Sequence, residues 1–332
     1  MSKLLKRICF CFLILIWGCL SVSCTGVEEE VYIPSDDEID LVLEEGETYH
    51  AGMGLGISLK NYELSVDGIV TVTGDIICGT GEGKTCLTYG DGDLLKIKVV
   101  RRHDLDTFIS FDRGKMYGKK FVIYGDSISA RATLQTGKKD WKDYLQQELG
   151  FTYECFAVSG SLFSYQYSHE SIVPARKCGC EYIEENGQAN QDADYALIWY
   201  GTNDFSCNVP IGNSVESDIS ADQTDSLKSS ICYAVKRLRK DNPDIKLIFL
   251  TQLYRDDLYN DGRVINGAGV SLQRYVNAVK ELSDELGYTV LDMFPLFSHE
   301  DFQAGGIYTK DGLHPNEDGH RVISDFLLGL NK

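Results

Sequence analysis

From Lys119 onward, short apolar runs alternate along the chain with longer stretches of helical periodicity. The apolar runs predict strands at Phe121–Tyr124, Tyr153–Ala157, Tyr195–Tyr200, Lys246–Thr251 and Thr289–Met293. Between them, apolar residues that share one helical face predict helices at Trp141–Leu149, Leu227–Arg239, Val270–Leu286 and Gly319–Leu328. Because parallel strands are joined by crossovers that cover the sheet, this alternation predicts an α/β domain over residues 119–332, with helices on both faces of a parallel sheet.

Residues 46–103 follow a different period and predict a small all-β domain. Leu95, Ile97 and Val99 alternate with polar neighbours, Ile69, Thr71 and Thr73 are expected to share one face of a strand, and glycine-rich turns separate the runs. The patterns at 64–74 and 83–88 resemble bacterial Ig-like domains of the second type. No titratable cluster lies there, so we expect a spacer rather than a weak carbohydrate contact. Residues 24–45 predict a tether with one strand at Ile39–Leu43, and residues 104–118 a linker.

The N-terminus predicts export. Lys3, Lys6 and Arg7 precede an apolar run from Ile8 to Leu20, which is too short for a comfortable membrane span and is typical of a signal peptide over residues 1–23. The small residues before Cys24 resemble a lipobox, with Cys19 as the weaker alternative, and the acidic tract 28–30 resembles the export signal of Bacteroides-like surface lipoproteins. These resemblances imply a lipid anchor at Cys24 and an outer-membrane or cell-surface location, or a periplasmic one without the anchor.

The chain is acidic, with a formal net charge of -18 that becomes -21 once the three basic residues of 1–23 are removed. Nucleic-acid binding needs a basic face, and no Lys/Arg cluster follows the N-terminus, so this class of partner is excluded. Seven cysteines follow Cys24, an odd number that cannot pair completely. Cys78 and Cys86 can form a local disulfide or remain thiols, and the spacing of Cys178, Cys180 and Cys207 fits no common zinc site.

Two segments at the ends of the α/β domain carry candidate chemistry. Gly125-Asp126-Ser127 breaks the first strand sharply, which leaves the Ser127 hydroxyl at the carboxyl end of a strand. Near the C-terminus, Asp311 precedes His314 by three residues with Gly312 between them. A tight turn can hold this carboxylate against Nδ1 of the imidazole, which frees Nε2 to take a proton from a serine. The alternative is a helix-capping Asp beside a packed histidine.

Two further strand ends carry polar groups that can stabilise an oxyanion. Asn203 follows the strand 195–200 and can donate from its side-chain amide. Gly160 follows the strand 153–157 and allows a backbone N–H to approach a substrate closely. Each residue taken alone is more typical of a turn.

In chain order, Gly-Asp-Ser, Gly, Gly-x-Asn-Asp and Asp-x-x-His resemble the four blocks of SGNH (GDSL-type) hydrolases over residues 119–332. The resemblance implies a flavodoxin-like three-layer sandwich and no cofactor. It also implies Ser127 as nucleophile, His314 as general base, Asp311 as its orienting acid, and the Ser127 N–H, the Gly160 N–H and the Asn203 side chain as the oxyanion hole. The chain lacks Gly-x-Ser-x-Gly and His-Glu-x-x-His, which argues against an α/β-hydrolase lipase and a zincin.

These features together predict a surface-tethered serine esterase that removes acyl groups, acetyl above all, from glycans. The alternatives are a lysophospholipase or thioesterase and, from another class, a catalytically silent glycan-binding lipoprotein. The polar segment after Gly201 favours a polar substrate, and near Ser127 only Arg131 offers the cation that phosphodiester or sulfate hydrolysis needs. We expect Asp204 to brace its loop, Trp199 to be core and His320 to lie away from the site. Tyr165, Tyr167 and Tyr254 can stack on a sugar, and His169 and His299 can border the pocket.

Overall fold

The computed structural model describes residues 31–35, 38–51, 55, 57–100, 111, 113–132, 134–168, 176–212, 219–260 and 263–329. The predicted signal peptide, the lipid attachment at Cys24 and His169 lie outside these residues. Within the described ranges, we find no helix with the length and apolar character that a membrane crossing requires.

Five strands of the described chain form the sheet of the α/β domain, all in parallel pairs. They are β8 (Lys120–Gly125), β9 (Thr152–Cys155), β10 (Tyr195–Trp199), β11 (Lys246–Leu250) and β14 (Thr289–Leu291). Their spatial order is β14-β11-β10-β8-β9. Numbered within the domain this is 2-1-3-4-5, the flavodoxin-like order, in which the first strand lies between the second and the third. The predicted parallel sheet is confirmed.

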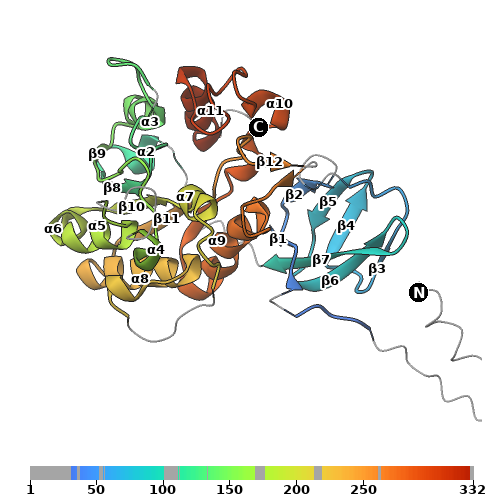
Figure 1. Cartoon of the computed structure of the whole chain (residues 1–332). Helices are drawn as coiled ribbons and strands as arrows, with labels where there is room; N and C mark the ends of the chain where they lie inside the picture. The colour runs from blue at the N-terminus through green and yellow to red at the C-terminus, as the bar shows by residue number, and fades with distance from the viewer. Residues whose placement is uncertain are drawn as a thin grey trace, which may run out of the picture. The chain divides into compact units, whose positions relative to one another are not determined.

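Helices cover both faces of this sheet, because successive strand residues point to opposite sides. Phe121 and Ile123 of β8 pack into one buried cluster with α3 (Trp141–Leu149) and α11 (Glu317–Leu327). Val122 and Tyr124 pack into a second cluster with α5 (Gly179–Glu185), α8 (Leu227–Asp241) and α9 (Leu272–Leu286). Figure 1 shows β8, β10 and β11 among these helices. The four long helices lie where the apolar periodicity predicts them.

Several short elements have no counterpart in the sequence-based prediction. One or two turns contain too few residues to show a period, so their ends are decided by local hydrogen bonds and packing. They are α2 (Arg113–Met116), α4 (Tyr165–Ser168), α5 (Gly179–Glu185), α6 (Gly187–Asp192), α7 (Thr202–Ser206), α10 (His299–Phe302), the 3₁₀ turns η3 (Ala221–Gln223) and η4 (Phe294–Leu296), and the hairpin β12 (Tyr259–Asn260) and β13 (Arg263–Val264).

The N-terminal β region contains two sheets around one apolar core. One has the order β1-β7-β6-β3, from β1 (Leu41–Glu44), β7 (Asp93–Val100), β6 (Gly83–Tyr89) and β3 (Tyr62–Leu64). The other has the order β2-β5-β4, from β2 (Thr48–His50), β5 (Ile76–Gly79) and β4 (Val70–Thr73). Leu95, Ile97 and Val99 are buried as predicted, whereas in β4 the buried residue is Val70 while Thr71 and Thr73 face solvent.

Two predicted boundaries need correction. The tether over 24–45 is too long at its C-terminal end, because β1 pairs in parallel with β7 and buries Leu41 and Leu43 in the β domain. The linker over 104–118 is likewise too long, because Phe111 and Met116 are buried in the cluster beneath α3. In both segments the apolar side chains were too few to show a period, yet they suffice to fasten the chain to a core.

The β domain is fastened to helix α9 by buried polar contacts. Lys280 on α9 is only 2% exposed, and its Nζ lies 2.6 Å from Glu47 of the β domain and 3.0 Å from Asp292. Asn277 accepts a hydrogen bond from the Val42 N–H (3.1 Å) and donates to the Asp40 carbonyl (3.0 Å). These contacts join the β domain directly to helix α9 of the α/β domain.

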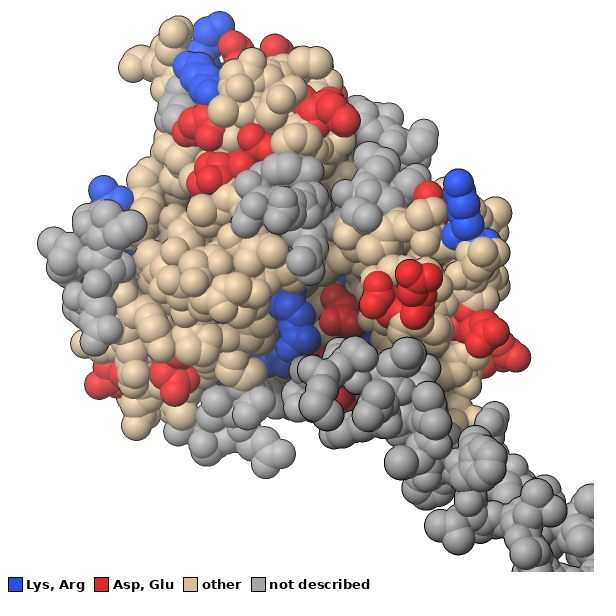
Figure 2. Space-filling model, turned by 45° about the vertical axis from the view of Figure 1, so that its right-hand side comes forward, with Lys and Arg blue, Asp and Glu red and all other residues tan. Residues whose placement is uncertain are grey.

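The surface of the described residues agrees with an acidic protein. Figure 2 shows acidic side chains at many places on the visible face and Lys or Arg side chains at separate places, without a continuous basic patch on that face.

Candidate active site

Ser127 lies in the turn directly after β8, and glycine is needed to form that turn. A Cβ on Gly125 would come within 2.8 Å of Ser129 Oγ and 3.0 Å of the Trp199 carbonyl oxygen, so a larger residue would push the turn away from β10. The Ser127 side chain is almost buried, at 5% exposure. Because Ser127 is this buried, a substrate can reach its hydroxyl only by entering the site beside it.

The structure joins Ser127, His314 and Asp311 by a continuous chain of hydrogen bonds. His314 Nε2 lies 3.0 Å from Ser127 Oγ, although the two residues are 187 positions apart in the sequence. On the other side of the ring, His314 Nδ1 lies 2.7 Å from Asp311 Oδ2. In this arrangement the imidazole can take the hydroxyl proton while the carboxylate fixes the ring's tautomer and orientation.

The loop that carries His314 is built around Thr309, a residue that the sequence did not single out. Thr309 Oγ1 accepts hydrogen bonds from the N–H groups of Asp311 (3.3 Å) and Gly312 (3.1 Å) and donates to the His314 carbonyl (2.8 Å). The loop is closed by a bridge between Thr309 and Pro315. Serine and threonine often bond to nearby backbone in turns, but this tendency gave no reason to choose Thr309 among the others.

Asp311 is held in its ionised form. Its burial raises the pKa, but hydrogen bonds from the backbone N–H of His314 and from the His314 ring outweigh burial, so the pKa of Asp311 lies below its usual value. Oδ1 accepts from the N–H groups of His314 (2.7 Å) and Leu313 (3.0 Å), which leaves Oδ2 for the imidazole. An ionised carboxylate at Nδ1 stabilises an imidazolium.

Gly160 and Asn203 lie at the strand ends on either side of Ser127. The Val158 N–H donates to the Gly125 carbonyl (3.0 Å), so the pairing of β9 with β8 continues as far as the serine turn. Gly160 lies two residues beyond Val158 and has a φ of +76°. On the other side Trp199 pairs with Gly125, and Asn203 follows in α7. One amide hydrogen of Asn203 is donated to the Ser161 carbonyl (3.0 Å), so its second remains available. The carboxyl ends of three neighbouring strands thus surround Ser127.

Comparison with known families agrees with this geometry. A family model described as GDSL-like lipase/acylhydrolase matches residues 123–322, which is more than half of the chain. The matched range includes the five candidate site residues, Ser127, Gly160, Asn203, Asp311 and His314. The chain belongs to the GDSL-like lipase/acylhydrolase family. It is therefore a hydrolase that acts on ester bonds, and the SGNH (GDSL-type) resemblance is confirmed at the level of the family.

One solved structure shares the fold of this GDSL-like acylhydrolase. One crystal structure, 20% identical, aligns with a TM-score of 0.51 over 64% of this chain and 95% of its own. A protein from Lactobacillus plantarum (22% identity, TM-score 0.49, 65% and 97% covered) and a possible lipase from Chitinophaga pinensis (17%, 0.47, 64% and 97%) are also similar. Comparison with curated proteins gives no match.

Two buried carboxyl groups support the loops of the GDSL-like domain. Both oxygens of Asp204 accept the Phe163 N–H, and one also accepts the Ser164 N–H, so Asp204 braces the loop after Gly160 as predicted. Asp126 accepts the Ile128 N–H at 3.1 Å within the serine turn. Burial raises the pKa of Asp204 to about 6 and that of Asp126 to about 7. Neither group is in hydrogen-bond contact with Ser127 or His314.

The remaining candidates of the GDSL-like domain separate into core and pocket. Trp199 and His320 are buried, at 3% and 0% exposure, so the prediction that Trp199 is core is confirmed, and the His320 ring has no hydrogen-bond partner. Arg131 pairs with Asp143 at 2.8 Å. Tyr254 and His299 line a large groove, whereas Tyr165, the first residue of α4, packs against the core. Cys78 and Cys86 are free thiols.

Proposed function

We propose that the chain is a serine esterase that removes small acyl groups, acetyl above all, from glycans. The hydrogen-bonded chain from Asp311 through His314 to Ser127 supports this proposal most strongly. Family membership supplies the ester bond. The acyl group and the glycan are inferred from the export signal that the sequence predicts and from the polar sequence segment after Gly201.

The reaction follows from the roles that these groups can take. Ser127 Oγ attacks the ester carbonyl as His314 Nε2 takes its proton, and the Asp311 carboxylate stabilises the imidazolium that forms. The N–H groups of Ser127 and Gly160 and the Asn203 amide donate to the oxyanion, and one such donor contributes about 2.7–4 kcal/mol in measured cases. His314 then protonates the leaving alcohol. Water, deprotonated by the same imidazole, releases the acid from Ser127.

Hydrolysis of p-nitrophenyl acetate by Ser127→Ala tests the mechanism, with Ser129→Ala as the matched control. Ser129 is a buried serine two positions away whose hydroxyl has no hydrogen-bond partner. We expect Ser127→Ala to lose activity and labelling by a fluorophosphonate probe, and Ser129→Ala to keep both. Equal rates for Ser127→Ala and the parent would refute the mechanism, and an unlabelled parent would indicate a silent binding protein.

The length of the acyl chain separates the esterase from its alternatives. A deacetylase prefers p-nitrophenyl acetate over the octanoate, whereas a lysophospholipase or thioesterase shows rising activity with chain length. Released acetate from acetylated xylan, pectin, sialic acids and mucin glycans would then identify the glycan. A rate that rises steadily to the octanoate would contradict the glycan deacetylase.

We further propose that the chain is exported and anchored through Cys24, and that its β domain is of the bacterial Ig-like type. The charged and apolar segments before Cys24 support export. The two sheets packed around one core support a sandwich. Incorporation of radiolabelled palmitate into the parent, compared with Cys24→Ser, tests the anchor, and labelling of the variant at the parent's level would refute it.

A further inference from the structure

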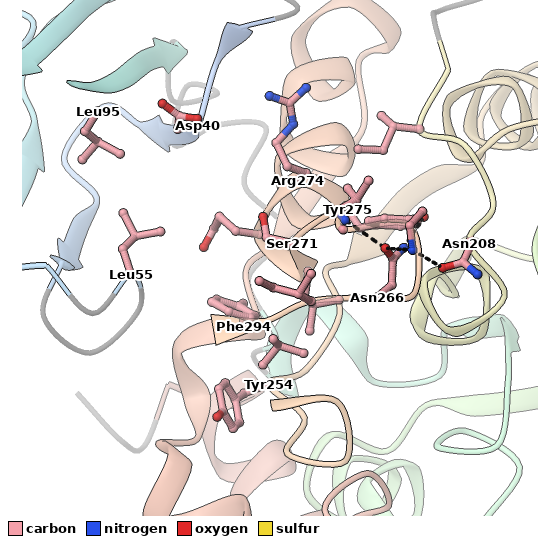
Figure 3. Close-up of a pocket in the computed structure, with 18 of the residues that line it drawn as sticks. Asp40, Leu55, Leu95, Asn208, Tyr254, Asn266, Ser271, Arg274, Tyr275 and Phe294 are labelled. Atoms are coloured by element: carbon pink, nitrogen blue, oxygen red, sulfur yellow. Dashed lines mark hydrogen bonds between the residues drawn. The ribbon is translucent and has the colours of Figure 1, made fainter. Parts of the chain in front are cut away.

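A groove of about 820 Å³ lies between the β domain and the start of helix α9. In Figure 3, Leu55 and Leu95 of the β domain lie on one side of the groove, and Ser271, Phe294 and Tyr254 lie on the other. Tyr254 follows β11 and Phe294 follows β14, so the groove opens at the carboxyl edge of the sheet. Ser127 follows β8 at the same edge.

The two walls are held at a fixed spacing by the contacts that dock the β domain. Besides the ion pairs of Lys280, the Tyr49 hydroxyl donates to Gln273 Oε1 at 3.0 Å. The guanidinium of Arg274 donates to the Ile39 carbonyl at 2.6 Å. Gln273 and Arg274 both line the groove, so the residues that join the two domains also shape it. A groove built on buried contacts is preformed, as most ligand sites are.

Short contacts connect the end of this groove to the loop that carries His314. The Tyr254 hydroxyl lies 3.2 Å from His299 Nδ1, which in turn lies 2.7 Å from Asp256 Oδ1. The backbone N–H of Asp256 donates to the Gly312 carbonyl at 2.7 Å. Gly312 stands between Asp311 and His314, so these contacts join the groove to the loop that carries the reacting groups.

The lining selects a ligand that is both apolar and rich in hydroxyl groups. Tyr89, Leu94 and Tyr254 offer aromatic and aliphatic surface, while Ser271 and Asn208 offer a hydroxyl and an amide. The side chain of Ser271, although it is the N-cap of α9, makes no capping hydrogen bond. The charges of Asp40 and Arg274 in the lining are opposite, which favours a neutral ligand. Sugar rings present apolar C–H faces and hydroxyl edges, whereas a fatty acyl chain offers no hydrogen-bonding partner to the Ser271 hydroxyl.

We propose that this groove binds the neutral sugar chain that carries the ester, as an extended subsite formed jointly by the β domain and α9. This inference rests on the proposed function, because it names the part of the substrate beyond the scissile acyl group. The volume lies within the range of about 300–1,000 Å³ that is typical of ligand pockets and is far larger than an acetyl group needs.

Leu94→Arg in the full-length chain tests the groove, and Ile76→Arg is its matched control. Both residues are exposed leucine or isoleucine side chains of the β domain (47% and 42%), but only Leu94 lines the groove. Each change is combined with Ser127→Ala, which prevents turnover. Binding of cellohexaose, xylohexaose, mannohexaose and chitohexaose is then measured by calorimetry up to about 10 mM.

We expect at least one hexasaccharide to bind, with a dissociation constant that Leu94→Arg raises at least about tenfold and Ile76→Arg changes less than about twofold. Absence of binding to all four sugars, or binding that Leu94→Arg leaves unchanged, would overturn the inference. Ile76→Arg in the presence of Ser127 should leave p-nitrophenyl acetate hydrolysis unchanged, since Ile76 lies outside the groove. A parent inactive on that ester would refute the proposed function alone, since sugar binding is measured without catalysis.

Discussion

Replacement of Thr309 by valine tests how much the loop of His314 depends on one buried hydroxyl. Thr309 is 1% exposed, and valine has nearly the same shape, so the change removes hydrogen bonds and leaves little cavity. The N–H groups of Asp311 and Gly312 and the carbonyl of His314 each lose a partner. At about 1 kcal/mol for each bond, Thr309→Val should lower the free energy of unfolding by roughly 3 kcal/mol.

The same change should reduce catalysis, because His314 loses the support that aims Nε2 at Ser127. A misplacement of about 1 Å typically costs about 100-fold in rate, so we expect kcat/KM on p-nitrophenyl acetate to fall by about 10- to 100-fold.

The assays are urea unfolding followed by tryptophan fluorescence, and initial rates under conditions where the variant is fully folded. Thr309→Ser is the control, since it keeps the hydroxyl and loses only a buried methyl group, at a cost of about 1 kcal/mol. Its kcat/KM should stay close to the parent's. If Thr309→Val matches the parent in kcat/KM, Thr309 does not position the catalytic loop.

Three further changes probe charge. Asp311→Asn should lower kcat/KM by about 10⁴-fold, as loss of the orienting carboxylate does in serine proteases. Because the folded pKa of Asp311 is depressed, its stabilising effect is lost as pH falls through that value, and urea unfolding of the variant should show less of this acid loss. Burial lowers the pKa of His320 from 6.5 to about 4, so the unfolded chain binds more protons in that window and stability falls by up to about 3 kcal/mol as pH drops from 6.5 to 4. His320→Leu should remove this loss, and an unchanged pH dependence of the urea midpoint would contradict the reasoning. Lys280→Met leaves the Glu47 and Asp292 carboxylates without their buried cation and should lower the free energy of unfolding by about 3–5 kcal/mol. This loss should exceed that of Glu47→Gln. Equal urea midpoints for Lys280→Met and the parent would show that the ion pairs do not hold the β domain.

An element could be predicted from the sequence where its apolar periodicity is visible within a single segment. The strands and the four long helices show their period within one segment, so the parallel α/β sheet could be predicted. Short elements such as α7 show no period. The boundaries at Leu41 and Met116 were placed wrongly because a few apolar residues belong to a core only when the rest of that core is known.

The sequence by itself determined the contact between Asp311 and His314. The two residues are three positions apart with Gly312 between them, so a single turn brings carboxylate and imidazole together. The sequence also determined that Ser127 stands at a strand end. Only the tertiary structure decided that His314 Nε2 lies 3.0 Å from Ser127 Oγ, because the order of the strands in the sheet sets which loops meet. The docked β domain and the groove beside α9 were decided in the same way, by side chains such as Glu47 and Lys280 whose partnership depends on packing.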